Sequence, residues 1–389
     1  MRVMVILALL VGLLAWFGWS RADDGGASRL PPDEFPTDGS PGSVRSSNGL
    51  TSGSASGPGA AAGDGSGLSA GAAGSLSGGL SEGLPTLADL LKHVDRPALE
   101  ALERRLKAAV EQSPHDGVLR SDLCETARLL GHFDLAAEQG ERAISLLPNV
   151  SRTHHLYAKA LGEQMRSGGL FTAIRLVGSY KEQMAEAIAL DSQNFRARAE
   201  QIAFLLFMPS IGGGDKDRAA QLADQLEGDD SRWGLLVQAL VLAENDDEAG
   251  AVAVCEGALD LFPGDQKIAV TLAGLLEDVG RNDEADEQFA AVLEGARGEA
   301  YYMALYQRAR MHIRAGQRLR ESITALEAFV AARPYGEFLS PVEGAYYRMG
   351  SAWQKLGETA QARAAYGQAL ELDPDFERAE EALDALGDS

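Results

Sequence analysis

The stretch Glu343–Pro374 decides the fold of this chain. It reads EGAYYRMGSAWQKLGETAQARAAYGQALELDP. Apolar residues recur at helical spacing on both sides of Gly357, which predicts two helices joined by a tight turn. Small residues at Gly350 and Ala362 would let the two backbones approach, and the large residues Trp353 and Tyr366 would fill the gaps beside them. The stretch therefore predicts one closely packed helical hairpin.

This hairpin resembles the tetratricopeptide repeat, a helix-turn-helix unit of about 34 residues with small residues on both helices, a glycine at the turn and a proline at the end. Earlier copies of the pattern occur along the chain. The clearest copies carry Cys124, Ala127 and Ala136, then Ala239, Ala251 and Cys255, then Ala273, Ala285 and Phe289 at matching positions. With weaker copies between them, the resemblance extends from about Leu84 to Leu386.

The resemblance implies an all-α fold, a right-handed α-α solenoid of about eight tetratricopeptide-like hairpins over residues 85–389. A helix at Phe376–Leu386 would cap the stack, because its Glu and Arg side chains can face water. No hairpin would fold alone, since each buries its apolar face on its neighbours. The solenoid would also have a concave inner surface that is free to receive a partner.

Residues 1–22 have the pattern of a targeting segment. Arg2 supplies a positive end, and Val3–Trp19 is an uninterrupted run of apolar residues and glycine. A cleavable secretory signal fits this pattern, with Ser20 and Ala22 as the small residues before the cut. An uncleaved signal anchor fits it equally, and residues 3–19 would then tether the protein to a membrane. We therefore expect an exported protein, periplasmic or anchored to the membrane and facing the exterior.

Residues 23–84 are rich in Gly, Ser and Ala. Such a composition cannot bury enough apolar surface to offset the entropy of ordering, so it predicts a disordered linker. As a flexible coil it would span on the order of 40 Å and hold the folded part away from a membrane.

The chain carries a formal net charge of -22 at pH 7. An acidic surface repels the phosphates of nucleic acids and of anionic lipids, so we expect no nucleic acid partner. The same charge suits a basic protein partner, although acidic helix surfaces are also common in proteins that bind nothing there.

The resemblance further implies where a partner would bind. In tetratricopeptide proteins, certain first-helix positions line the concave groove, and Tyr and Arg are residue types that anchor interfaces. The matching positions that we select here are Arg128, Trp233, Tyr306, Arg310, Tyr347 and Gln354. They predict binding of a peptide or helix segment of a partner protein. Packing between repeats is the alternative role for Tyr306 and Tyr347. The Lys, Asn and Arg set by which some family members hold a C-terminal carboxylate is absent, so that ligand is not expected.

One loop departs from the repeat. Gly212, Gly213 and Gly214 precede Asp215 where the fourth copy should have a tight turn. Three glycines before a helix can form an anion-binding nest, and Asp215 can cap the helix that follows. A similar loop occurs in exported bacterial tetratricopeptide proteins, including periplasmic partners of solute transporters. The alternative function is therefore a solute-binding or transporter-associated subunit that holds a small ligand in the lumen of the solenoid.

No catalytic motif stands out, so we expect no enzyme, no cofactor and no metal. His154 and His155 are adjacent, so on a helix they point about 100° apart and cannot hold one ion from one face. Cys124 and Cys255 occupy packing positions in distant repeats, which favours buried free thiols over a disulfide. The sequence favours a non-catalytic interaction scaffold and leaves its oligomeric state open.

Overall fold

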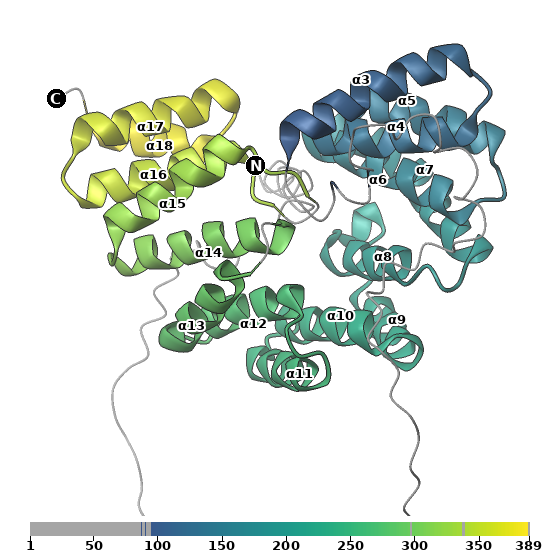
Figure 1. Cartoon of the computed structure of the whole chain (residues 1–389). Coiled ribbons are helices and arrows are strands. Elements are labelled where there is room, and N and C mark those ends of the chain that lie inside the picture. The colour runs from purple at the N-terminus through teal and green to yellow at the C-terminus, as the bar shows by residue number, and fades with distance from the viewer. Residues whose placement is uncertain (1–86, 88–89, 91–94, 296–297, 337–338, 388–389) are drawn as a thin grey trace, which may run out of the picture. The chain divides into compact units, whose positions relative to one another are not determined.

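The computed structural model describes residues 87, 90, 95–295, 298–336 and 339–387. Helices make up most of these residues, and no β-strand occurs among them. This confirms the predicted all-α fold (Figure 1). The predicted targeting segment and linker, residues 1–22 and 23–84, lie outside the described residues.

The helices follow one another as hairpins, each packed on the next. The first helices of the hairpins are α4 (Gly117–Leu130), α6 (Ser151–Ser167), α8 (Phe195–Phe207), α10 (Ser231–Glu244), α12 (Gln266–Asp278), α14 (Glu299–Ala315) and α16 (Val342–Lys355). The second helices are α5 (Phe133–Leu146), α7 (Gly169–Leu190), α9 (Lys216–Asp229), α11 (Glu248–Leu261), α13 (Asn282–Leu293), α15 (Leu319–Ala332) and α17 (Thr359–Leu372). Helix α3 (Arg96–Gln112) precedes them and α18 (Glu377–Ala385) follows them.

First helices of neighbouring hairpins also contact one another directly. Helix α4 contacts α6, α8 contacts α10, α10 contacts α12, and α14 contacts both α12 and α16. Stacking of hairpins in one direction produces the α-α solenoid that the repeat pattern predicts. We call the side formed by the first helices, α4 to α16, the inner face.

The small residues that identify the repeats lie in the interior. Ala273 and Ala285 are fully buried where α12 meets α13. Gly350 is required for a close approach of α16 and α17, because a Cβ atom there would lie 2.5 Å from the ring of Tyr366. The residue types that reveal the repeat in the sequence are therefore the ones that set the distance between its helices.

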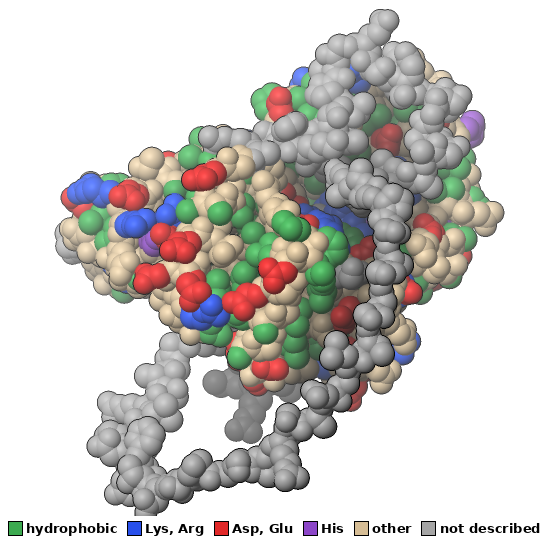
Figure 2. Space-filling view, turned by 60° about the horizontal axis from the view of Figure 1, so that its bottom comes forward, with side chains coloured by type: hydrophobic (Ala, Val, Ile, Leu, Met, Phe, Trp, Pro, Cys, Tyr) green, Lys and Arg blue, Asp and Glu red, His purple; other side chains and the backbone are tan. Residues whose placement is uncertain are grey.

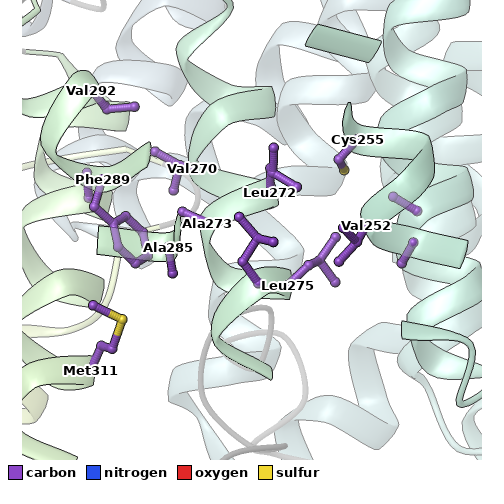
Figure 3. Close-up of a cluster of buried hydrophobic side chains, with 14 of the residues drawn as sticks. Val252, Cys255, Val270, Leu272, Ala273, Leu275, Ala285, Phe289, Val292 and Met311 are labelled. Atoms are coloured by element: carbon purple, nitrogen blue, oxygen red, sulfur yellow. The ribbon is translucent and has the colours of Figure 1, made fainter. Parts of the chain in front are cut away.

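The core continues from hairpin to hairpin. In one cluster, Leu272 of α12 lies among Val252 of α11, Phe289 of α13 and Met311 of α14 (Figure 3). Five consecutive helices, α10 to α14, contribute to this cluster, so no hairpin closes a core of its own.

Most hairpins have a glycine within two residues of the end of the first helix. Gly131, Gly280, Gly316 and Gly357 all have positive φ angles. Asp246 stands at the corresponding place between α10 and α11, with φ of 63°. A left-handed backbone favours glycine, so this hairpin keeps the turn with a less suitable residue.

The loop between α15 and α16 contacts the beginning of the helical array. Tyr335 is buried there, and its hydroxyl donates to the Leu90 carbonyl at 2.8 Å and accepts from the Asp95 amide at 3.2 Å. Arg96 donates to the Arg333 carbonyl at 3.4 Å. Tyr335 and Leu90 are 245 residues apart in the sequence, so the first and the last part of the array are joined directly.

The surface agrees with the acidic composition. Figure 2 shows Asp and Glu side chains spread over one face of the folded part, among patches of hydrophobic side chains. None of the helices in the described part is both long enough and apolar enough to span a bilayer.

Candidate functional site

Tyr306, a predicted contact residue on α14, lies in the core. Its side chain is 1 % exposed, and its ring packs against Phe329 of α15 at a centroid distance of 5.5 Å. The ring therefore holds the two helices of one hairpin together, which is a packing role, and it offers no surface to a partner in this structure.

Arg310, one turn further along α14, is also buried and forms an ion pair. Its Nη2 atom lies 2.7 Å from Oε2 of Glu277 on α12, and Nη1 of Arg314 lies 2.9 Å from the other carboxylate oxygen. One carboxylate thus links two arginines of the next first helix. The charge that the sequence assigned to a partner is engaged in joining neighbouring repeats.

Arg128 belongs to a larger group of charges on α4 and α6. Its guanidinium donates twice to Glu125, from Nε at 3.0 Å and from Nη2 at 3.1 Å. Nη1 of Arg128 lies 3.5 Å from Glu163 on α6, and Nζ of Lys159 lies 3.6 Å from Glu125. The buried Arg128 therefore links two first helices through carboxylates on both.

The pKa values show how strongly these charges depend on one another. Burial opposes the charge of Glu125, but Arg128 and Lys159 outweigh it and hold the pKa of this carboxyl well below its ordinary value. Burial lowers the pKa of Lys159 to about 8. Removal of the buried Glu125 would therefore leave the buried charges of Arg128 and Lys159 without the carboxylate that they share.

The charges continue onto α8. Nε2 of His155 lies 2.8 Å from Glu200 Oε2, and Nε of Arg196 lies 3.4 Å from Glu200 Oε1. Burial again opposes the carboxylate, yet His155 and Lys159 keep the pKa of Glu200 below its ordinary value. We call the set that runs across α4, α6 and α8 the inner charge row. Its members are Glu125, Arg128, His155, Lys159, Glu163, Arg196 and Glu200.

Tyr347 and Gln354 are brought together at the other end of the array. The ring of Tyr347 lies 5.7 Å from that of Tyr366 and 5.4 Å from that of Phe376. Gln354 is exposed and accepts a hydrogen bond from the Tyr366 hydroxyl at 2.8 Å. Tyr347 therefore packs beside α17 and α18 while partly exposed, and Gln354 presents an amide to solvent.

Trp233, the remaining predicted contact residue, is half-buried on α10. It packs beside Leu236 and Ile268, and the guanidinium of Arg232 lies 5.6 Å from its ring centre. Its partly exposed ring is flanked by the packed core of two hairpins.

The glycine loop uses its own hydrogen-bond donors. The amides of Gly212 and Gly214 donate to the Pro209 carbonyl, that of Gly213 donates to Ser210, and that of Asp215 donates to Leu205. The expected anion nest therefore has no free amide among these four residues. The side chain of Asp215 accepts from the Arg218 amide at 2.9 Å, so the predicted helix cap is confirmed. The loop is a structural turn that starts α9.

The histidines and cysteines serve structural contacts. His154 lies 2.7 Å from Gln183 and His155 lies 2.8 Å from Glu200, so the two rings point to different partners. Cys124 and Cys255 are free and buried, as predicted, and burial raises the pKa of each thiol to about 12. In the part of the chain that the structure describes, no group of three or more His, Cys, Asp or Glu is placed to hold a metal.

The inner charge row is the feature that the sequence interpretation missed. A signal for it exists, since charged residues recur in the first helices of the second, third and fourth copies. Only Arg128 was selected from it, because the pairing partners come from different repeats and sequence spacing does not show which side chains meet.

Comparison with known proteins identifies the repeat. Residues 242–309 and residues 344–376 each match a family model of the tetratricopeptide repeat. A search of curated proteins found no match. The second matched region, residues 344–376, overlaps almost all of the stretch Glu343–Pro374.

Solved structures with a similar fold include three that share little sequence with this chain. Yeast Tom70 has a TM-score of 0.56 at 16% identity, over 77% of this chain and 61% of that one. A tetratricopeptide repeat protein from Parabacteroides merdae has a TM-score of 0.45 at 14% identity, over 74% of this chain and 98% of that one. The Cut9–Hcn1 hetero-tetramer of APC/C gives 0.49 at 11% identity, over 77% of this chain and 54% of that one.

At 16% identity the likeness to Tom70 supports the fold alone, and this chain spans only part of Tom70 and of Cut9–Hcn1. The two matched regions and the hairpins that repeat the same packing along the array carry the assignment. The chain therefore contains tetratricopeptide repeats, matched at residues 242–309 and 344–376.

Proposed function

We propose that this protein is a non-catalytic scaffold outside the cytoplasm that holds a segment of a partner protein against its inner face. Tetratricopeptide repeats build protein-interaction scaffolds, so the general role follows from the family. The inner charge row is the observation that supports this face as the binding surface.

The inner charge row suits a polar segment. Its members pair with one another, yet the side chains of Glu163, Arg196 and Glu200 remain 24%, 38% and 21% exposed. Charges held in place before binding lose little conformational freedom when a partner arrives, and complementary charges fix its register. We therefore expect a partner segment that carries both acidic and basic side chains, bound along α4, α6 and α8.

The exposed amide of Gln354 and the partly exposed ring of Tyr347 extend this surface on α16. An aromatic ring beside a hydrogen-bonding side chain is a common anchor in protein interfaces. Tyr306, Arg310 and Arg128 contribute indirectly, because they fix the first helices that present the exposed groups.

The proposed location rests on the pattern of residues 1–22, a positive residue followed by an apolar run. If the folded part is periplasmic, protease added to intact cells should digest it only after the outer membrane is made permeable. If the folded part faces the exterior, the protease should digest it without this treatment. Resistance until the cytoplasm itself is opened would contradict export. Mass spectrometry of the mature N-terminus would show whether Ala22 is the cleavage site.

A photo-crosslinking amino acid at Arg196 or Gln354 in the full chain tests the binding surface in the native cell. Glu138 on α5 is the matched control, because its side chain is 51% exposed and lies on a second helix. We expect a protein adduct from both inner-face positions that is absent from position 138. The same crosslinked proteins at positions 196, 354 and 138, or crosslinks found only at position 138, would rule out the inner face as the binding surface.

A further inference from the structure

Helix α7 begins with large hydrophobic side chains in water. Phe171 and Ile174 are 87% and 61% exposed. They are three residues apart on one helix, so they lie on the same face about one turn from each other. Isolated exposed hydrophobic residues are normal, but two adjacent ones of this size form a surface that can bind apolar material.

The same face carries unpaired positive charge in a strongly acidic chain. From Gln164 to Lys181 the sequence contains three basic residues and no Asp or Glu, although the net charge of the chain is -22. Lys181 follows Ile174 by seven residues, about two helical turns, and so lies on the same face, and Arg175 follows Phe171 by four residues and flanks the other edge of this face. Both side chains are exposed, and no ion pair involves either of them among the residues that the structure describes. Other surface arginines do form such pairs, for example Arg142 with Glu138 at 2.9 Å.

The glycine loop adds a third hydrophobic side chain beside this strip. Ile211 is 85% exposed. Two residues later, a Cβ atom on Gly213 would lie 2.5 Å from Nζ of Lys181, so the loop lies against the far end of the strip. We call this set, Phe171, Ile174, Arg175, Lys181 and Ile211, the α7 surface.

We propose that the α7 surface docks on an anionic lipid bilayer. A protein partner would need a separate cavity for each protruding hydrophobic side chain, whereas the boundary between headgroups and acyl chains accepts such side chains without a fitted cavity. Arg175 and Lys181 are then at the level of the lipid phosphates, where each adds attraction. Binding through this small surface is reversible, because few apolar groups are buried.

The remaining charge of the protein limits this contact to one place. Glu182 follows Lys181 directly and Glu186 lies about one turn further along α7, so the attractive part of the helix ends at Lys181. The acidic remainder is repelled by anionic lipid, which orients the molecule with α7 toward the bilayer. This inference goes beyond the scaffold role and depends neither on the partner protein nor on the tether at residues 3–19.

A fluorescent reporter on the α7 surface tests the proposal in the full chain. An environment-sensitive dye is attached to Ile174→Cys, and Cys124 and Cys255 are buried and do not compete for it. Leu372→Cys is the matched control, because Leu372 is also 54% exposed but lies between Glu371 and Asp373. Vesicles consist of phosphatidylcholine alone or of phosphatidylcholine with phosphatidylglycerol.

We expect the emission of the dye at position 174 to shift to the blue with anionic vesicles and to be quenched by lipid-attached quenchers. The dye at position 372 should stay in water. Replacement of both cations, Arg175→Gln with Lys181→Gln, should raise the apparent Kd for anionic vesicles about thirtyfold. Phe171→Ser should also raise the apparent Kd, both in the protein that keeps Arg175 and Lys181 and in the double variant that lacks them. These side chains are exposed, so an unchanged Tm will confirm that the variants fold.

Three results would overturn the proposal. The dye at position 174 could remain in water with every vesicle, which would leave the hydrophobic side chains to a protein partner. Both dyes could enter lipid equally, which would mean that the N-terminal apolar segment alone carries the protein there. Equal binding to neutral and anionic vesicles would remove the role of the cations.

Discussion

The two ends of the array join their helices by different chemistry. Across α4, α6 and α8, charged side chains such as Glu125, Arg128 and Glu200 link one first helix to the next. In α16 and α17, the aromatic ring of Tyr366 fills the space beside Gly350 instead. Buried ion pairs are weak sources of stability compared with apolar packing of similar volume. The comparison shows that charge pairs connect successive first helices at the N-terminal end, whereas an aromatic ring packs the two helices of one hairpin together at the C-terminal end.

The largest effect should come from the aromatic side of this comparison. Tyr366 is 1% exposed, so Tyr366→Ala leaves a large cavity between α16 and α17 and should lower the free energy of unfolding by about 3–5 kcal/mol. Urea denaturation at neutral pH measures the change. Tyr347→Ala is the matched control and should cost less, because this ring is partly exposed. Equal losses for the two variants would show that Tyr366 does not carry the packing.

On the charged side, Glu125→Gln should cost about 3 kcal/mol, because it leaves Arg128 and Lys159 buried without their shared carboxylate. The same denaturation experiment measures this loss. Glu163→Gln is the control, since its side chain is 24% exposed and water can replace the lost contact. If Glu125→Gln lowers the free energy of unfolding by less than Glu163→Gln does, Glu125 does not stabilise the buried charges of Arg128 and Lys159.

Acid should weaken the two regions unequally. The pKa of Glu125 is lowered in the folded protein, so its contribution to stability is present above its ordinary value of 4.5 and is lost as the pH falls through the folded pKa. Glu200 is shifted in the same direction. Burial raises the pKa of Glu343 on α16, so this group instead favours the fold at low pH and loses that contribution as the pH rises. Hydrogen exchange at pH 3 and at pH 6 should therefore show lost protection in α4, α6 and α8 and retained protection in α16. Uniform loss would contradict this assignment.

The smallest effects concern the turns. Gly357→Ala forces an alanine into a left-handed backbone and should cost about 1 kcal/mol. Asp246→Gly relieves the same strain between α10 and α11 and should stabilise the protein by up to about 1 kcal/mol. Calorimetry should show Tm changes of opposite sign, each about 3 °C. Shifts of the same sign would mean that contacts of Asp246, and not its backbone, decide its effect.

The fold was predictable because the repeat depends on residues whose size cannot vary. Gly350, Ala273 and Ala285 lie at close helix approaches, so the sequence shows them at fixed positions. The family also predicts which helices form the inner face. Each of these features depends on local spacing within one hairpin.

The candidate site was less predictable because it depends on contacts between hairpins. Tyr306 and Arg310 occupy positions that line the groove in the family, yet here their neighbours Phe329 and Glu277 bury them. Helical periodicity alone does not separate a core side from a groove side. The glycine loop also looked suitable for an anion until the destinations of its amides were known, and these depend on the backbone geometry of Pro209 and its neighbours.

The contact between Tyr335 and Leu90 changes how such an array should unfold. In a simple repeat array each repeat contacts only its nearest neighbours, so one terminus can unfold locally while the other stays folded. Here, displacement of Leu90 and Asp95 would remove two hydrogen bonds from Tyr335 in the loop that precedes α16. Because its two partners are 245 residues apart in the sequence, we expect this contact to form late in folding. This contact couples the unfolding of the two distant parts of the array. We therefore expect the array to unfold in a single cooperative transition and not in separate transitions of independent segments.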